Sequence, residues 1–83
     1  MTITLKCFAY LRQYLPPDAN SNVIAYEIEE GTSIQQLIQQ LNIDADMVEL
    51  AILNDVFVEP QQRNKTILQP ADTLALWPEV AGG

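Results

Sequence analysis

The stretch Ser33-Ile34-Gln35-Gln36-Leu37-Ile38-Gln39-Gln40-Leu41 decides the fold, because its pattern predicts an amphipathic α-helix. Its apolar residues recur at i, i+3, i+4 and i+7, the spacing that gathers them on one helical face. Four glutamines occupy the opposite, solvent-facing side. Ser33 followed three residues later by Gln36 is typical of a capping box, so the helix should begin directly after Ser33.

Five short segments on either side of this helix are typical of β-strands. They are rich in β-branched, leucine or aromatic residues, and turn-forming residues bound them. They comprise residues 2–8 and 23–29 before the helix, and residues 49–53, 56–58 and 73–77 after it.

The segments between the strands are predicted to be turns and one irregular stretch. Residues 9–15 should form a short helical turn, which Pro16 ends. Asn54-Asp55 is typical of a tight turn. In the irregular stretch at residues 61–69, we expect Ile67 and Leu68 to fill the core.

The first strand shows which side chains face the core. Residues 2–8 alternate with period two, so Ile3, Leu5 and Cys7 share one face and Phe8 lies on the other. We interpret Cys7 as a small core residue. The alternative, a reactive thiol, would need a positively charged and exposed setting, and nothing nearby in the sequence supplies one.

The order of the elements, two strands, a helix and three strands, is satisfied by one mixed sheet with the helix across one face. The first and last strands then lie side by side in the middle of the sheet, without crossed connections. This α+β arrangement is the β-grasp, or ubiquitin-like, fold. We expect a β-grasp domain over residues 1–77 and a flexible tail over residues 78–83.

The composition excludes several classes of function. Eleven acidic and four basic residues give a net charge of −7, the wrong sign for binding phosphate backbones, so we expect no nucleic-acid partner. No apolar run approaches the ~20 residues of a membrane span, and the first residues lack a signal-peptide layout. We therefore expect no membrane association and a cytoplasmic location. One cysteine and no histidine predict that this chain holds no metal and no cofactor.

The last residues offer one group for covalent chemistry. Gly82 and Gly83 have no side chains, so their backbone is slim enough to enter a narrow channel. The carboxylate of Gly83 can do chemistry that the side chains of this chain cannot. Two adjacent glycines at this place occur by chance in roughly one chain in 200 at average glycine content. The alternative interpretation is an ordinary frayed end, because chain termini are often disordered.

Three stretches carry a family resemblance. Phe8-Ala9-Tyr10-Leu11-Arg12 follows the first strand, and Pro70-Ala71-Asp72-Thr73-Leu74-Ala75-Leu76 is similar to a Gly-Asp-x-Val/Leu-x-Phe turn and strand. Trp77-Pro78-Glu79-Val80-Ala81-Gly82-Gly83 is similar to an aromatic-Pro-Pro-Val-Ala/Thr-Gly-Gly ending. Together they resemble the sulfur-carrier branch of the ubiquitin-like proteins, and more closely the small subunit of molybdopterin synthase.

The sequence departs from that family pattern at three positions. Glu79 stands where a second proline is usual, Trp77 where phenylalanine is common, and Asp55 where glycine often sits. None of these departures touches the reactive end.

The resemblance implies a reaction at Gly83, next to Gly82. An ATP-using, E1-like adenylating enzyme first activates the Gly83 carboxylate. A sulfur donor protein then displaces AMP and leaves a thiocarboxylate. The tail enters the large catalytic subunit of molybdopterin synthase, where the sulfur passes to a pyranopterin precursor of the molybdenum cofactor. Six extended residues span about 20 Å, enough to reach a buried pocket.

Three aromatic side chains are expected on the sheet face away from the core, namely Phe8, Phe57 and Trp77. Phe8 and Trp77 should be adjacent, because the first and last strands are neighbours. An apolar aromatic patch on an open sheet face is typical of a protein interface. The alternatives are that residues 61–68 cover it, or that the aromatics are exposed singly and without consequence.

The resemblance implies that this surface binds the large subunit, together with tail residues. Pro78, Val80 and Ala81 are the tail residues expected to contact that partner. Arg12 either pairs with a partner carboxylate or is simply solvated.

Two other functions stay open. The same carrier chemistry could serve thiamine thiazole synthesis or another pathway, although thiazole carriers usually lack a proline at the place of Pro78. The chain could instead be a non-catalytic ubiquitin-like modifier, joined through Gly83 to a lysine, or an interaction domain. Removing Gly82 and Gly83 separates these classes, because sulfur transfer and conjugation need them and a pure binding module does not.

Overall fold

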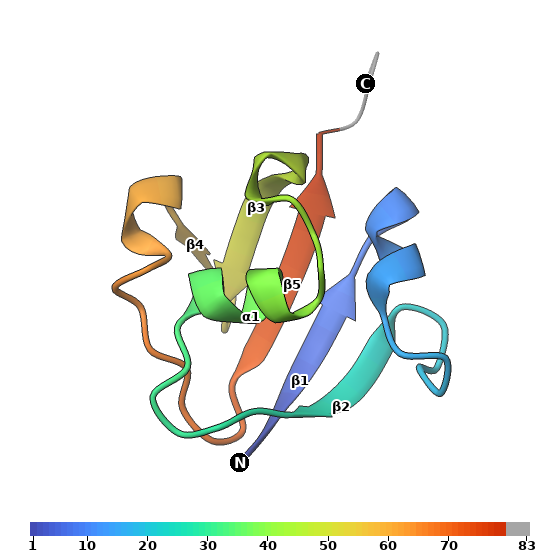
Figure 1. The fold of residues 1–83 in the computed structure, drawn as a ribbon, viewed down its shortest axis with the longest axis horizontal. Coiled ribbons are helices and arrows are strands. Elements are labelled where there is room, and N and C mark those ends of the chain that lie inside the picture. Colours follow the sequence, from blue (N-terminus) through green and yellow to red (C-terminus); the bar gives the residue numbers. More distant parts are fainter. Residues whose placement is uncertain (80–83) are drawn as a thin grey trace.

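A mixed β-sheet with one α-helix across one face makes up the described part of the chain, residues 1–79, in the computed structural model (Figure 1). The strand order is β2-β1-β5-β3-β4, in which β1 and β5 are parallel and the other neighbours antiparallel. The elements are β1 (Thr2–Cys7), β2 (Val23–Glu27), α1 (Ile34–Gln40), β3 (Val48–Leu53), β4 (Val56–Val58) and β5 (Thr73–Pro78).

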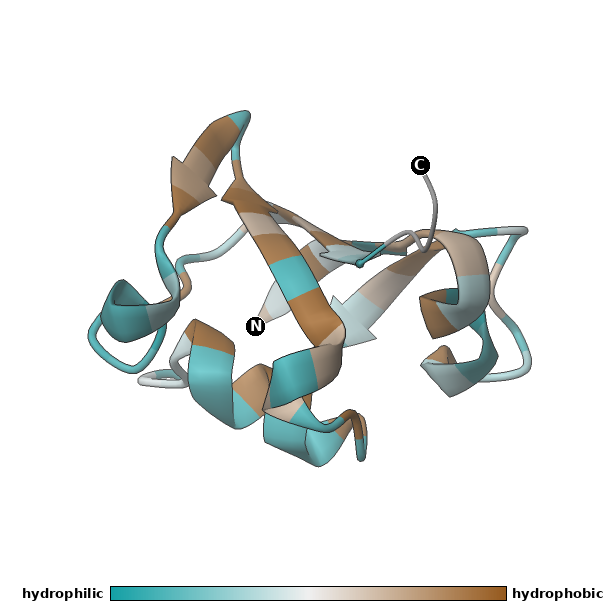
Figure 2. Ribbon diagram, turned by 90° about the horizontal axis from the view of Figure 1, so that it is seen from above, coloured by the Kyte–Doolittle hydropathy of each residue, from teal (hydrophilic) through white to brown (hydrophobic). Residues whose placement is uncertain are grey.

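The predicted β-grasp fold is confirmed. β1 and β5 lie side by side in the middle of the sheet, in register from Thr4 opposite Thr73 to Cys7 opposite Leu76. Parallel neighbours cannot be joined by a tight turn, so the chain between them forms the rest of the fold. In the view of Figure 2, α1 lies on one side of the sheet, and no helix of residues 1–79 covers the other.

The helix forms where the glutamine-rich stretch predicted it. The Ser33 hydroxyl accepts from the Gln36 backbone N–H at 3.1 Å, and the Gln36 side chain accepts from the Ser33 backbone N–H at 2.9 Å. Ile34, Leu37 and Ile38 are fully buried under the sheet. The other buried apolar residues are Ile3, Leu5, Cys7, Leu11, Leu15, Ile28, Leu41, Ile43, Val48, Ala51, Leu68, Leu74 and Leu76.

Three short 3-10 helices occur within residues 1–79. The helical turn predicted at residues 9–15 is η1 (Ala9–Tyr14), whereas η2 (Ala45–Met47) and η3 (Pro60–Gln62) lie in segments for which no helix was predicted. Strand β2 ends at Glu27, two residues earlier than predicted.

The prediction that Ile67 fills the core is wrong, and the one for Leu68 is confirmed. Ile67 is 42% exposed, while Leu68 is 1% exposed. The reason is a local bridge between Ile67 and Ser33, which extends the backbone there. Consecutive side chains of an extended backbone point to opposite sides, so only one of the two can face the core.

The turn between β3 and β4 needs no glycine. Asn54 and Asp55 both have positive φ, at 51° and 70°, which is the conformation of a type I′ hairpin turn. The Asn54 side chain also donates to the Asp72 carboxylate at 2.9 Å and accepts from the Thr73 N–H at 2.8 Å. These bonds tie the hairpin to the start of β5.

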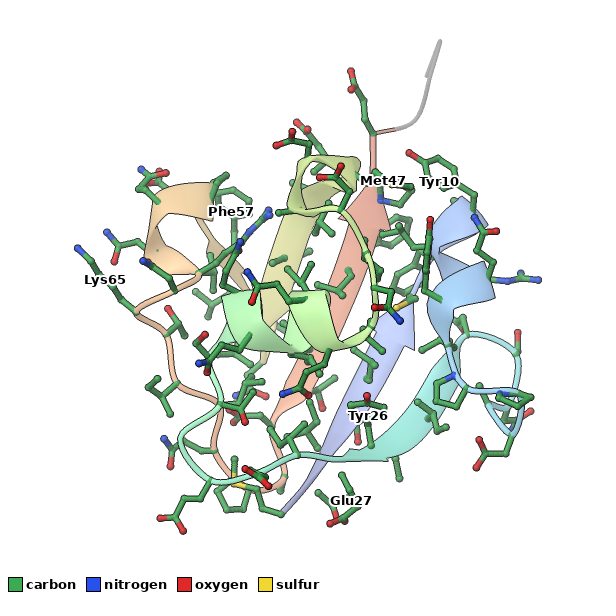
Figure 3. All side chains as sticks on the ribbon, viewed as in Figure 1. Tyr10, Tyr26, Glu27, Met47, Phe57 and Lys65 are labelled. Carbon is green, nitrogen blue, oxygen red and sulfur yellow. The ribbon has the colours of Figure 1, made fainter. Side chains whose placement is uncertain are left out.

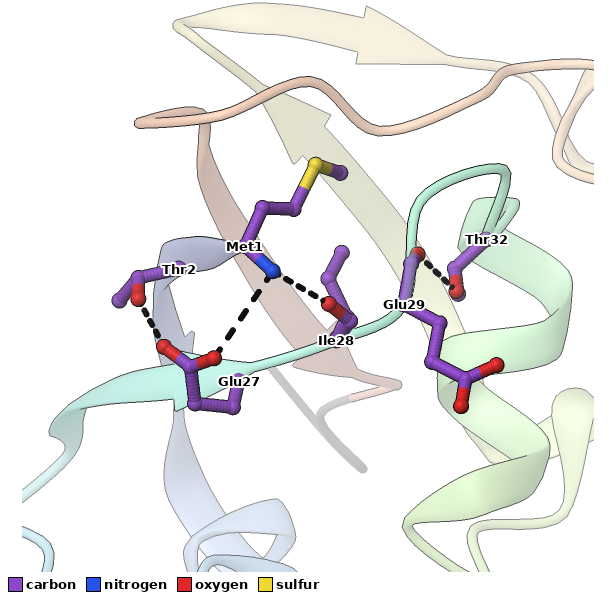
Figure 4. A network of polar contacts seen from close by, with 6 residues as sticks. All are labelled: Met1, Thr2, Glu27, Ile28, Glu29 and Thr32. Carbon is purple, nitrogen blue, oxygen red and sulfur yellow. Dashed lines mark hydrogen bonds and ion pairs between the residues drawn. The ribbon is translucent and has the colours of Figure 1, made fainter.

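The first residue of the chain is held at the same end of the sheet, where β1 and β5 both start (Figure 4). The Met1 ammonium donates to the Ile28 carbonyl at 2.8 Å and lies 3.8 Å from the Glu27 carboxylate. The Thr2 hydroxyl donates to the same carboxylate. Because the Glu27 side chain is 77% exposed, this ion pair contributes at most about 1 kcal/mol.

Ala71 stands in a backbone conformation that suits glycine, the residue of the family turn. Its φ is 68°, in the left-handed region that costs a residue with a Cβ about 1–2 kcal/mol. We predict that Ala71→Gly raises the free energy of unfolding by about 0.5–1 kcal/mol, because this strain exceeds the added chain entropy of glycine. Urea unfolding measures the change. Ala25→Gly in the exposed part of β2 is the control and should lower stability; a loss for both variants would contradict the strain at Ala71.

The interpretation of Cys7 as a core residue is confirmed. Its side chain is 0% exposed, and burial raises the pKa of the thiol from 9.0 to about 11. A thiol in this setting stays protonated at neutral pH, and reagents in solvent cannot reach it.

The Cys7 thiol should make stability depend on pH in the alkaline range. Between pH 9 and 11 the unfolded thiol loses its proton while the folded one keeps it, so stability should fall as pH rises through this window. The measurement is the unfolding free energy at pH 8, 9, 10 and 11 for the wild type and Cys7→Ala. We expect a steeper fall in the wild type. Equal slopes would show that the thiol pKa is the same in both states.

Candidate functional site

The face of the sheet opposite α1, called the outer face below, carries apolar side chains from the middle of the sheet to the β4 edge and polar ones towards the starts of β1 and β5. Strand register places Trp77 opposite Leu50, and Ile52 between Ala75 and Phe57. These side chains are half-buried or exposed, in contrast to the buried set on the other face. The outer face consists of Thr2, Thr4, Lys6, Phe8, Val23, Ala25, Glu27, Leu50, Ile52, Phe57, Thr73, Ala75 and Trp77.

Phe8 and Trp77 form an aromatic stack at one end of the outer face. Their ring centroids are 3.8 Å apart and their planes differ by 2°. The pairing follows from the parallel register of β1 and β5, which the Phe8 N–H continues by donating to the Leu76 carbonyl at 3.1 Å. The adjacency predicted for these two residues is confirmed.

Strand β5 stays paired with β3 as far as its last residue, Pro78. The predicted tail begins at Pro78, but β5 includes this residue, which is buried and lies opposite Val48 of β3. The chain therefore leaves the sheet at Glu79, directly after the aromatic stack. The predicted site residues Val80, Ala81, Gly82 and Gly83 lie outside the described residues.

Phe57 and Arg12 lie apart from the stack. Phe57 is 48% exposed on the edge strand β4, beside η3 (Figure 3), where it lines a hollow with Leu50, Pro60 and Arg63. Arg12 is exposed on η1 and has no ion pair within residues 1–79. Phe57 thus belongs to the outer face but lies near its far edge.

Sequence reasoning missed the side chains that join the stack to Phe57. Leu50 is 37% exposed, and with Ile52 and Ala75 it makes the apolar surface continuous. The period-two pattern of residues 49–53 contains this signal, but it becomes readable only once β3 is known to pair with β5. Tyr10, 48% exposed beside the end of β5 (Figure 3), was also missed.

Arg63 is a buried cation that no sequence pattern indicated. It is 2% exposed, its Nη2 donates to the Glu49 carbonyl at 3.4 Å, and its Nε has no partner. Burial lowers the pKa of the guanidinium, and the Glu49 carboxylate opposes this shift. Because the Arg63 carbonyl also accepts from the Gln35 N–H at 3.1 Å, the residue joins the segment after η3 to both β3 and α1.

Residues 1–79 hold no cluster of three or more histidine, cysteine or acidic side chains suited to a metal ion. No helix in this part of the chain is long and apolar enough to cross a membrane.

A protein-family model described as the ThiS family matches residues 7–83. The chain belongs to the ThiS family. This is a family of ubiquitin-like sulfur carriers, so the predicted membership is confirmed. Family members work with partner enzymes, which gives the apolar outer face of this ThiS-family chain a general role as a candidate binding surface.

Solved structures share the fold of this ThiS-family chain at low sequence identity. A protein assigned as molybdopterin converting factor, subunit 1, from Pyrococcus furiosus is 21% identical with a TM-score of 0.67, over 95% of this chain and 98% of that one. SAMP1 from Haloferax volcanii is 16% identical with a TM-score of 0.66, over 100% of both chains. Urm1 from Trypanosoma brucei is 16% identical with a TM-score of 0.67, over 99% of this chain and 95% of that one. A search of curated proteins finds no match.

The stack should contribute measurable coupling between β1 and β5. In a double-mutant cycle of Phe8→Leu and Trp77→Leu, we expect a coupling energy of about 0.5–1.5 kcal/mol, since stacked rings contribute beyond their buried area. Urea unfolding followed by circular dichroism measures it. The control cycle pairs Trp77→Leu with Phe57→Leu, which is not in the stack and should be additive within about 0.5 kcal/mol. Equal coupling in both cycles would argue against a specific stack.

Proposed function

We propose that this chain is the sulfur-carrier small subunit of molybdopterin synthase. Three observations support the proposal: membership of the ThiS family, a Trp77-Pro78 lead-in to Gly82-Gly83, and a structural neighbour assigned as a molybdopterin converting factor subunit. The observation that carries most weight is the anchoring of β5. The Phe8–Trp77 stack and the buried Pro78 fix the position of the backbone as far as residue 78, which is five residues before Gly83 and its reactive carboxylate.

The proposed reaction takes place at the carboxylate of Gly83. ATP supplies an adenylyl group and pyrophosphate leaves, which converts a poor electrophile into an acyl adenylate. A nucleophilic sulfur then attacks the acyl carbon and AMP leaves; with hydrosulfide as donor, loss of one proton gives the thiocarboxylate directly. Transfer of that sulfur to the pyranopterin precursor, with water taking its place on the acyl carbon, restores the carboxylate.

The described residues supply binding and position in this scheme. Five extended residues, the number from 79 to 83, span about 17 Å. This is the largest distance that can separate the end of β5 from the reaction site in a partner's pocket. The proposed partners are the large catalytic subunit, an ATP-dependent activating enzyme and a sulfur donor protein, all in the cytoplasm. ATP is bound by the activating enzyme, and the chain itself holds no cofactor.

Two alternatives have some support. The family match is equally compatible with a carrier for thiamine thiazole or another sulfur-containing product, against which the Pro78 lead-in argues. A ubiquitin-like modifier joined through Gly83 to a lysine has the same fold, but the resemblance to SAMP1 and Urm1 is one of fold alone.

Intact mass spectrometry tests the carrier chemistry directly. After incubation with ATP, a cognate activating enzyme and hydrosulfide, the mass should rise by the difference between one sulfur and one oxygen. A chain lacking Gly82 and Gly83 should show no rise, because it lacks the group that is adenylated. Adding the large subunit and the pterin precursor should then return the mass to its starting value.

The outcomes separate the three functions. No mass change with an activating enzyme that modifies its own carrier would rule out both sulfur-carrier proposals. If the thiocarboxylate persists after the large subunit and the pterin precursor are added, the chain is a sulfur carrier, but molybdopterin synthesis is ruled out as its pathway. Conjugates that survive reducing denaturation would indicate a modifier.

A further inference from the structure

Lys6 lies on the outer face between apolar residues of both neighbouring strands, where a charged side chain is unexpected. The register places it between Val23 of β2 and Ala75 of β5, two residues before Phe8 on its own strand. It alternates with the buried Leu5 and Cys7, so its side chain points to the outer side. The nearest outer-face neighbours across both adjacent strands are therefore apolar.

Lys6 has no acidic partner in the described structure. The one ion pair within residues 1–79 joins the Met1 ammonium to Glu27, and Glu27 lies at the opposite end of the β1–β2 pairing, opposite Thr2. The whole sequence has eleven acidic residues and only four basic ones. Among the side chains of residues 1–79, Lys6 is thus a cation that no carboxylate neutralises.

Two simpler explanations for this lysine fit poorly. Lysine often blunts an exposed sheet edge against aggregation, but β1 is an interior strand with β2 on one side and β5 on the other. Pairing of two copies through their outer faces is also disfavoured. A two-fold axis close to Lys6 would place the two Lys6 ammonium groups side by side, and like charges repel; the net charge of −7 on each copy adds to this repulsion.

We infer that Lys6 is a specificity contact, and that the protein which binds the outer face presents a carboxylate to it within an apolar surface. The inference rests on the proposed function and names the large catalytic subunit as that protein. The partner that takes the tail must cover the place where β5 ends. Ala75, directly beside Lys6, is only two residues before Trp77, about 7 Å along the strand. A carboxylate there would pair with Lys6 as the interface excludes water.

The test is binding of the full chain to the purified large subunit from the same organism, measured by isothermal titration calorimetry. Lys6→Glu should weaken binding at least about tenfold, because it places two negative charges together in the interface. Lys6→Gln should weaken it less, by about threefold to tenfold, since it only removes the pair. Lys65→Glu, at an exposed lysine in the loop after η3 (Figure 3), is the matched control and should stay within about twofold. Circular dichroism verifies that each variant is folded.

Charge reversal in the partner identifies the contact. Lysine substitution of one acidic residue on the large subunit's binding surface should restore binding of Lys6→Glu and weaken binding of the wild type. Equal binding by wild type, Lys6→Glu and Lys6→Gln would overturn the inference. So would a wild-type chain that binds the activating enzyme but not the large subunit, or one that self-associates through this face in sedimentation equilibrium.

The thiocarboxylate assay keeps the two proposals distinguishable. If wild type and Lys6→Glu both acquire sulfur at Gly83 and bind the large subunit equally, the carrier function stands and the role of Lys6 fails. If the wild type acquires no sulfur with an active enzyme, the proposed function fails, and the inference about the large subunit fails with it.

Discussion

The parallel pairing of β1 with β5 is the constraint on which the rest of the structure depends. It joins the first strand to the last, so every other element lies on the connection between them. The same register puts Leu5 beside Leu74 and Cys7 beside Leu76 in the core. One residue further, it puts Phe8 against Trp77 on the outer face, where the chain is about to leave the sheet. Core and candidate site thus follow from one pairing.

The small size of the domain explains why one face stays open. Its α-helix, Ile34–Gln40, covers one side of a five-stranded sheet, and the chain provides no second helical layer within residues 1–79. A domain of this length buries only about 60–65% of its extended surface. Apolar side chains such as Leu50 and Phe57 therefore stay at the surface, which is unfavourable in a monomer and useful in a subunit that must associate.

Local patterns in the sequence predicted most of the fold and part of the site. The capping box at Ser33 and the alternation of Ile3, Leu5 and Cys7 depend on neighbours a few residues away, so they could be read directly. The Phe8–Trp77 stack needed only one non-local assumption, that the first and last strands adjoin. The exposure of Ile67, the burial of Arg63 and the outer-face position of Leu50 depend on tertiary contacts, namely a bridge to Ser33, a carbonyl of Glu49 and a β-bulge before the pairing with Trp77. A short-range pattern gives at most the alternation of Leu50 and Ile52 with their neighbours, and not the face of the sheet that they occupy.

The burial of the one thiol fits the chemistry proposed for Gly83. An acyl adenylate reacts with any accessible thiolate to give a thioester, and such a thioester would trap the carrier in an unproductive form. The chain has a single cysteine, and Cys7 is fully buried with its thiol pKa raised by desolvation, so it is both out of reach and protonated. Histidine, the usual general base that could activate a water against the adenylate, is absent from the sequence. A carrier that must survive activation until a sulfur donor arrives gains from having neither an accessible thiol nor an imidazole base.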